Sequence, residues 1–127
     1  ALRLKSCRFM GFVDVRPFLE KASILAMTSS SEGFPMVILE AANYGVVPVA
    51  YNISHGVSHL IDNSCNGLLI KPFDQKRYIR ELSALMSNSE KLGMMSEHVK
   101  RSAYKYDIRN IAEKWLSIIN EVKNEKS

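Results

Sequence analysis

The chain has 127 residues, 46% of them hydrophobic and 24% charged, which is the composition of one globular domain of ordinary size. Its net charge of +4 comes from basic residues scattered among acidic ones, so we expect a solvated surface and no nucleic-acid-binding patch. Cys7 and Cys65 lie in different elements and indicate neither a disulfide framework nor a metal cluster, and no apolar run approaches the ~18 residues of a membrane-spanning helix.

The first elements are predicted as short apolar strands separated by helices. Residues 8–13 are apolar enough for a buried strand, with Gly11 permitting a bend near its end. A short helix at residues 18–22 and a buried strand at residues 24–27 follow. This alternation is typical of parallel βα units, whose functional loops lie at the carboxyl ends of the strands. Because the chain begins with Ala and enters a strand almost at once, we expect a piece of a longer protein.

Residues 29–45, SSSEGFPMVILEAANYG, read as such a loop running into a helix. Pro35 suits the first helical position, and Gly45 suits a left-handed C-cap. Glu32 precedes the helix, and Glu40 lies five residues past Pro35, about 7.5 Å along the helix axis. The free N–H groups of the helix start lie between these carboxylates and form a seat for a phosphate. A nucleotide-sugar, with an anionic middle and hydroxyl-rich ends, fits this layout.

The two acidic residues also have simpler interpretations. Glu32 could only cap the helix or interact with its dipole, and Glu40 could be an ordinary exposed carboxylate. A buried, unpaired carboxylate is costly, so Glu40 must face solvent or a hydrogen-bonding partner. Gly33 lacks a side chain where a ligand would approach the backbone, which favours a binding site. Phe34 is more typical of a packing residue than of a ligand platform.

Residues 46–51 are predicted as a β-branched strand, and residues 52–58 as a second loop at a strand end. His55 and His59 are spaced four apart and could face one way on a helix, as metal ligands do. No third ligand is apparent, so we expect no metal site. We interpret His59 as a structural hydrogen-bonding residue and His55 as a residue that borders the pocket.

The remainder of the chain is predicted as one strand and three helices. Asn66-Gly67 is a turn signal before a strand at residues 68–70, and Asp74 is a helix N-cap. The helices are expected at residues 75–86, 89–104 and 107–123, with a disordered tail at residues 124–127. The residues whose helical spacing predicts that they face the core are Tyr78, Leu82, Leu85, Met94, Val99, Ile111, Trp115 and Ile118.

The segment EGFPMVILEA resembles the Glu-(seven residues)-Glu signature of retaining glycosyltransferases with GT-B architecture, the glycogen-synthase-like and family-four group. Three further segments resemble the family in its order: FMGFVDV, FLEKASILAMTSSSEGFP and VVPVAYNISHGVSHLIDNSCNGLLIKPFD. The resemblance covers most of residues 8–120. It implies an α/β fold, a Rossmann-like parallel sheet flanked by helices, in which residues 1–123 form the C-terminal, nucleotide-sugar-binding half of a two-domain enzyme.

The resemblance also implies roles for named residues. Glu32 would be the catalytic residue, holding hydroxyls of the transferred sugar as an electrostatic stabiliser, which we favour, or as a transient nucleophile. Glu40 would bind the ribose hydroxyls. The other donor-binding positions are the N–H groups of Gly33 and Phe34 at the sugar, Met36 and Val37 at the diphosphate, and Phe12, Val13 and Asp14 around the nucleobase. The nucleotide-diphosphate sugar is a co-substrate, and neither a metal nor another cofactor is implied.

The implied function is transfer of a hexosyl-type sugar to a glycan or lipid-linked acceptor, which an N-terminal domain missing from this chain would bind. Where relatives usually carry a Gly-Gly loop and a glutamate, this chain has Ser54-His55-Gly56 and His59, so donor selectivity is not carried over. We expect a cytoplasmic enzyme, with peripheral association at the inner face of a membrane left open, and an inactive isolated chain. Two alternatives remain: a non-catalytic doubly wound nucleotide-binding or regulatory module, and a sugar-nucleotide epimerase of the same architecture.

Overall fold

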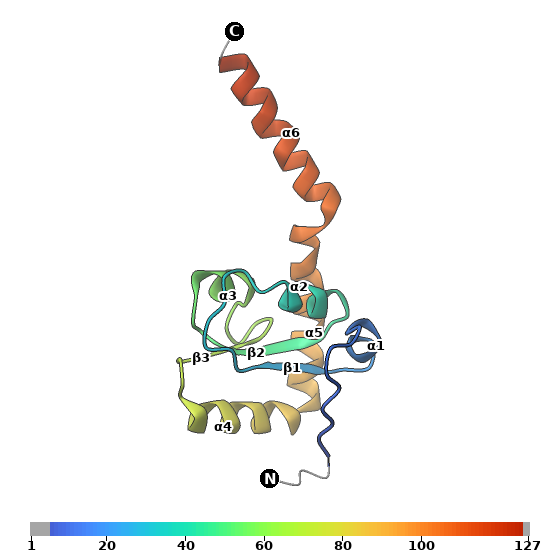
Figure 1. Ribbon diagram of the computed structural model, residues 1–127, viewed down its shortest axis with the longest axis vertical. Helices are drawn as coiled ribbons and strands as arrows, with labels where there is room; N and C mark the ends of the chain where they lie inside the picture. The colour runs from blue at the N-terminus through green and yellow to red at the C-terminus, as the bar shows by residue number, and fades with distance from the viewer. Residues whose placement is uncertain (1–5, 126–127) are drawn as a thin grey trace.

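In the computed structural model, which describes residues 6–125, three parallel strands form a sheet with helices on both faces (Figure 1). The strands are β1 (Ile24–Met27), β2 (Val47–Tyr51) and β3 (Leu68–Ile70), in the order β1-β2-β3. Ile24 pairs with Val47, and Val49 pairs with Leu68, so β2 is central. The predicted α/β fold class is confirmed, and each of these strands lies within a segment predicted as a strand.

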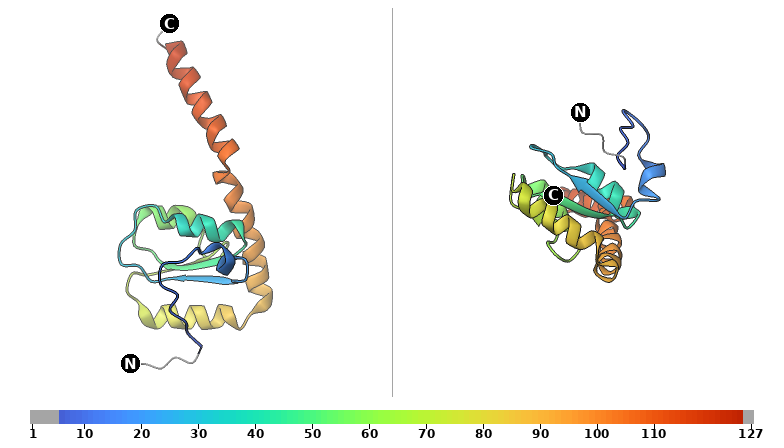
Figure 2. Two further views of the ribbon diagram at one scale, coloured as in Figure 1. Left: turned by 45° about the vertical axis from the view of Figure 1, so that its right-hand side comes forward. Right: turned by 90° about the horizontal axis from the view of Figure 1, so that it is seen from below.

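The helices form layers on either side of this sheet. Helices α2 (Met36–Asn43) and α3 (His55–Leu60) cover one face, whereas α4 (Gln75–Met86) covers the other (Figure 1, Figure 2). Helix α5 (Ser89–Ala103) runs across the sheet and packs against α2, α4 and β2. The remaining helical elements are the short α1 (Arg16–Leu19), the 3₁₀ turn η1 (Tyr104–Tyr106) and the long α6 (Ile108–Glu125).

The core is built around β2, whose residues are all buried. Side chains alternate between the two faces of a strand. Val47, Val49 and Tyr51 accordingly join the apolar cluster that includes Tyr78 of α4, whereas Ala50 joins the cluster beneath α2 and α3. Burial on both faces is typical of a central strand in a parallel sheet.

Residues 8–13 do not form the predicted strand. Phe9 and Phe12 are 95% and 108% exposed, and the backbone of this segment pairs with no strand in the described part of the chain. The prediction is wrong because an apolar pattern does not supply the hydrogen-bonding neighbour that a strand requires. The helix predicted at residues 18–22 begins earlier, at Arg16, because Pro17 favours a first helical turn.

The predicted loop at residues 52–58 is wrong in its second half, because α3 begins within it at His55. The Ser54 hydroxyl accepts a hydrogen bond from the Val57 N–H at 3.3 Å and so caps this helix. Two other helix ends agree with the sequence. The Asp74 carboxylate accepts a hydrogen bond from the Arg77 N–H at 3.0 Å, and Gly45 follows α2 with a φ of 73°.

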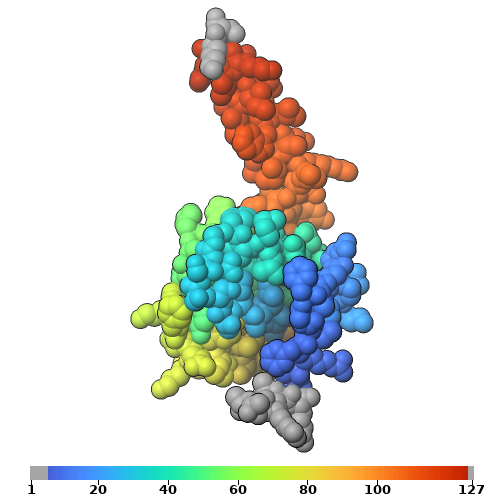
Figure 3. Space-filling model, viewed as in Figure 1, coloured from blue at the N-terminus to red at the C-terminus, as the bar shows by residue number. Residues whose placement is uncertain are grey.

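Helix α6 extends away from the sheet (Figure 1, Figure 3). Trp115 and Ile118 are 62% and 51% exposed, so the prediction that they face the core is wrong, and no described residue of α6 is fully buried. The helix reaches Glu125, so residues 124–125 of the predicted disordered tail are helical, and residues 126–127 lie outside the described residues. None of the helices between residues 6 and 125 is long and apolar enough to cross a membrane.

The helix-face predictions for α4 and α5 are confirmed with one exception. Met95 is buried in place of Met94, which is 56% exposed, because the buried positions of α5 repeat every four residues through Met95, Val99 and Ala103. The predicted inward residues that are buried or half-buried are Tyr78, Leu82, Leu85, Val99 and, on α6, Ile111.

Tyr78 links α4 to the two neighbouring strands. Its hydroxyl donates a hydrogen bond to the Val49 carbonyl at 2.8 Å and lies 3.4 Å from the Met27 carbonyl. Burial raises the pKa of Tyr78 from its ordinary value of 10.0 to about 12, and the nearby Tyr51 adds to this effect. The neutral phenol therefore stabilises the folded state fully below pH 10, and this contribution is lost as the pH rises through about 12.

We expect Tyr78→Phe to lower the free energy of unfolding at neutral pH by about 1 kcal/mol, because a buried hydrogen bond is lost. Between the unfolded and folded pKa values, 10.0 and about 12, wild-type protein should lose stability more steeply than Tyr78→Phe. Thermal unfolding followed by circular dichroism over this pH range measures both effects. Tyr104→Phe is the control, since Tyr104 is 72% exposed. Parallel alkaline losses in wild type and Tyr78→Phe would contradict the assignment.

Candidate functional site

The loops that follow β1 and β2 lie side by side, because the two strands are parallel neighbours. The first loop, residues 28–35, runs into α2, and the second, residues 52–54, runs into α3. The Ser54 hydroxyl donates a hydrogen bond to the Gly33 carbonyl at 3.3 Å. The loop that carries Glu32 is thus held against the start of α3.

The amino end of α2 has no side-chain cap. Pro35 is its N-cap, with a φ of −76° and a ψ of 97°, rather than its first residue as predicted, and proline offers no side-chain oxygen and no N–H group. The Ile38 N–H donates to the Pro35 carbonyl at 3.1 Å, but nothing within residues 6–125 accepts from the N–H groups of Met36 and Val37. These two amides lie at the positive end of the helix and can donate to an anion.

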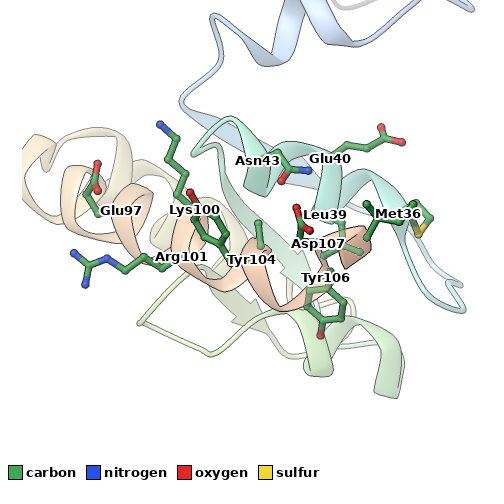
Figure 4. A pocket seen from close by; sticks show the side chains of 12 residues that line it. Met36, Leu39, Glu40, Asn43, Glu97, Lys100, Arg101, Tyr104, Tyr106 and Asp107 are labelled. Carbon is green, nitrogen blue, oxygen red and sulfur yellow. The ribbon is translucent and has the colours of Figure 1, made fainter. Parts of the chain in front are cut away.

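The two predicted acidic residues have no basic partner in the described part of the chain. Glu32 is half-buried in the loop, Glu40 is exposed on α2, and neither takes part in an ion pair there. Glu32 also makes no hydrogen bond to the start of α2, so it does not cap this helix. In Figure 4 the Glu40 side chain projects from α2 away from α5. Both carboxylates can therefore accept hydrogen bonds from ligand hydroxyls.

A groove of about 390 Å³ lies between Glu40 of α2 and the segment that precedes α1. It is lined by Asp14, Val15, Arg16, Leu19, Glu40, Asn43 and Tyr44. The structure thus brings together Asp14 and Glu40, two of the residues predicted to bind the donor. It does not bring Phe12 and Val13 into this groove; these side chains are 108% and 40% exposed.

Arg16, in the same groove, is a residue that the sequence prediction missed. Its guanidinium donates to both carboxylate oxygens of Asp14, at 3.0 Å from Nε and 2.7 Å from Nη2. These hydrogen bonds lower the pKa of Asp14 and raise the pKa of Arg16. Part of the Asp14 carboxylate is therefore already engaged. An aspartate two residues before an arginine at a helix start is the sequence signal that could have indicated this pair.

A larger groove of about 640 Å³ lies between α2 and the junction of α5 with α6 (Figure 4). Met36 borders it, and Glu40 and Asn43 line both this groove and the smaller one. The wall opposite α2 carries charges of both signs, from Glu97, Lys100, Arg101 and Asp107. No motif in the sequence marks these four residues, because the packing of α5 against α2, and of η1 and α6 after it, brings them here.

Phe34 packs against η1 and keeps an exposed face. Its side chain is 46% exposed, and its ring centroid lies 6.2 Å from that of Tyr106, which lies 6.3 Å from that of His59. His55 and His59 have ring centroids 6.1 Å apart, so they lie on one side of α3 as their spacing predicts. Residues 6–125 contain no group of three His, Cys, Asp or Glu side chains that could hold a metal ion.

Sequence comparison relates most of the chain to sugar-transferring enzymes. Residues 1–102 match the family model for glycosyl transferases group 1. An uncharacterized glycosyltransferase of Haemophilus influenzae is 33% identical over 106 residues, which are 84% of this chain and 30% of the relative. An alpha-1,4-N-acetyl-D-galactosaminyltransferase of Campylobacter jejuni is 29% identical over 117 residues, 91% of this chain and 33% of the relative. The chain therefore spans about a third of the length of these relatives.

Two solved structures with bound UDP or a UDP-sugar share the fold. The Anabaena protein HepE in complex with UDP-glucose superposes with a TM-score of 0.79 and 21% identity, over 90% of this chain and 32% of that one. The pneumococcal O-GlcNAc transferase GtfA in complex with UDP and GlcNAc gives a TM-score of 0.78 and 21% identity, over 91% and 24%. With the family model matching residues 1–102, this chain belongs to the glycosyl transferases of group 1 and has the fold of a GT-B C-terminal domain.

Proposed function

We propose that this chain is the donor-binding domain of a retaining glycosyltransferase, which transfers a sugar from a nucleotide-diphosphate sugar to a glycan or lipid-linked acceptor. The observation that carries the proposal is the uncapped start of α2, where the free amides of Met36 and Val37 lie in chain order between Glu32 and Glu40. A diphosphate bound at these amides would leave the transferred sugar near Glu32 and the ribose near Glu40. The nucleobase would then lie toward Asp14 and the smaller groove.

In the proposed mechanism the chain stabilises the departing diphosphate and an oxocarbenium-like transition state. The amides of Met36 and Val37 hold the leaving group, and the amides of Gly33 and Phe34 hold the sugar. Such preorganised donors act where charge develops in the transition state. Glu32 serves as an electrostatic stabiliser of the positive charge on the sugar ring.

The relatives supply the candidate donor and acceptor for this proposal. The solved structures of HepE and GtfA hold UDP-glucose, or UDP and GlcNAc, so UDP-sugars are the first donors to test. The Campylobacter jejuni relative is named for a glycan carried on undecaprenol diphosphate. A lipid-linked acceptor would place the enzyme at the inner face of a membrane, in peripheral association.

Two exposed apolar surfaces support a second domain that supplies the acceptor site. Phe9 and Phe12 are almost fully exposed, and α6 carries an apolar stripe with spacings of three and four residues. The members of this stripe are Ile108, Ile111, Trp115, Ile118 and Val122. Apolar surfaces of this kind normally contact another protein surface. We therefore propose that the isolated chain is inactive and that the full-length enzyme encloses the donor between two domains.

Glu40→Gln should weaken binding of the cognate nucleotide-sugar to the full-length enzyme by about ten- to a hundredfold, because a hydrogen bond to a charged acceptor is lost. Thermal stabilisation by UDP-, GDP- and ADP-sugars identifies the donor, and isothermal titration measures the loss. Glu90→Gln, a change of the same kind on the exposed first turn of α5, is the control and should bind as wild type does. Unchanged affinity in Glu40→Gln would remove Glu40 from the site.

Gly33→Ala should leave the free energy of unfolding within about 0.5 kcal/mol of wild type, because nothing lies within 4 Å of the added Cβ. It should nevertheless weaken donor binding about tenfold or more, because the methyl group would occupy the space where the sugar approaches the backbone. Gly93→Ala is the matched control, since its added Cβ also meets open space, but on α5. Full donor affinity in Gly33→Ala would show that the ligand does not reach this loop.

A further inference from the structure

The start of α3 and the loop at residues 28–35 meet backbone to backbone. A Cβ built on Gly56 would lie 1.9 Å from the Gly33 carbonyl oxygen and 3.1 Å from the Phe34 Cα. Only a residue without a side chain allows this approach, although Gly56 lies inside a helix, where glycine is unfavourable by about 1 kcal/mol relative to alanine. Glycine at position 56 therefore makes α3 less stable. The nearby Gly33 carbonyl explains why the position cannot hold a residue with a side chain.

Ser54 joins the same two segments through one hydroxyl group. Its oxygen accepts a hydrogen bond from the Val57 N–H at 3.3 Å, which caps α3, and its proton is donated to the Gly33 carbonyl at 3.3 Å. The loop has few other anchors, because Pro35 is its one fully buried residue. The neighbouring Phe34 ring lies 6.2 Å from that of Tyr106, which in turn lies 6.3 Å from the ring of His59 at the last turn of α3. The Gly33–Phe34 segment is thus linked to α3 by the Ser54 hydrogen bond and by the Phe34 ring through Tyr106.

We propose that Ser54 is a positioning residue for donor binding. Gly56, which has no side chain, lets the loop come close enough to α3 for Ser54 to hydrogen-bond to it. The Ser54 hydroxyl fixes the Gly33 carbonyl, and so fixes the direction in which the following amides and the Glu32 side chain point. A loop ordered before binding spares the ligand the entropic cost of ordering it. This inference rests on the proposed function, because it assumes that the loop contacts the donor.

The test compares Ser54→Ala, Ser54→Gly and Ser54→Thr in the full-length enzyme. Ser54→Ala removes both hydrogen bonds, whereas Ser54→Gly also removes the hydroxyl but costs a helix cap only a few tenths of a kcal/mol. Ser54→Thr keeps the hydroxyl. At a temperature where all variants are folded by circular dichroism, we expect Ser54→Ala and Ser54→Gly to raise the donor Kd about five- to tenfold. Ser54→Thr should restore the wild-type value.

Two further measurements separate positioning from general stability. Amide hydrogen exchange of residues 28–35 in the ligand-free protein should be faster in Ser54→Gly than in wild type, while exchange in β2 stays unchanged. Gly56→Ala should also raise the donor Kd, even though alanine favours the helix. Wild-type donor affinity in folded Ser54→Ala and Ser54→Gly would overturn this inference but not the proposed function. Failure of wild-type enzyme to bind any UDP-, GDP- or ADP-sugar would overturn the proposed function together with it.

Discussion

The parallel pairing of β1 with β2 is the constraint on which the site depends. It aligns Met27 with Ala50 at the carboxyl ends of the two strands, so the loops that follow leave the sheet together. Ile38 of α2 and Val57 of α3 then pack in one apolar cluster with Ala50, which fixes both helices on the same face. The position of the start of α2 in the fold is therefore set by packing in the core of the domain.

Three helices within residues 6–125 have an amino end capped by a side chain, whereas the amino end of α2 is left free to bind a ligand. Ser54, Asp74 and Asn88 cap α3, α4 and α5 through side-chain oxygens, whereas Pro35 gives α2 no cap. A serine or aspartate at that position would stabilise the helix by about 1 kcal/mol, but its side chain would take up one of the free amides. The buried Pro35 restricts the chain direction without consuming a donor. Stability is thus given up at the one helix start that the proposed function uses.

The sequence predicts those features that depend on local patterns. Residues 24–27 and 68–70 are short apolar strands flanked by turns, and the helix over residues 75–86 has both a cap and a clear period, so all three agree with the structure. Residues 8–13 and α6 have equally apolar patterns, but such patterns do not reveal whether a partner surface is present. For the site, the loop-to-helix pattern of the sequence marks Glu32 and Glu40. The local pair of Asp14 and Arg16 could also have been inferred from the sequence, whereas its position beside Glu40 and the wall opposite α2 depend on tertiary packing. The family match favours a glycosyltransferase domain over the regulatory module that was the alternative from sequence alone.

The charges around the proposed donor site indicate what this part of the chain would contribute to donor binding. A nucleotide diphosphate would lie beside two carboxylates, Glu32 and Glu40, and a helix start contributes only about half an elementary positive charge. Arg16 already pairs with Asp14, and Lys100 and Arg101 share their groove with Glu97 and Asp107. At the proposed site, the described part of the chain would therefore supply direction and hydroxyl recognition, with little net positive charge. Because charges attract most strongly where water is excluded, any cations of the proposed second domain would act best once the two domains enclose the donor.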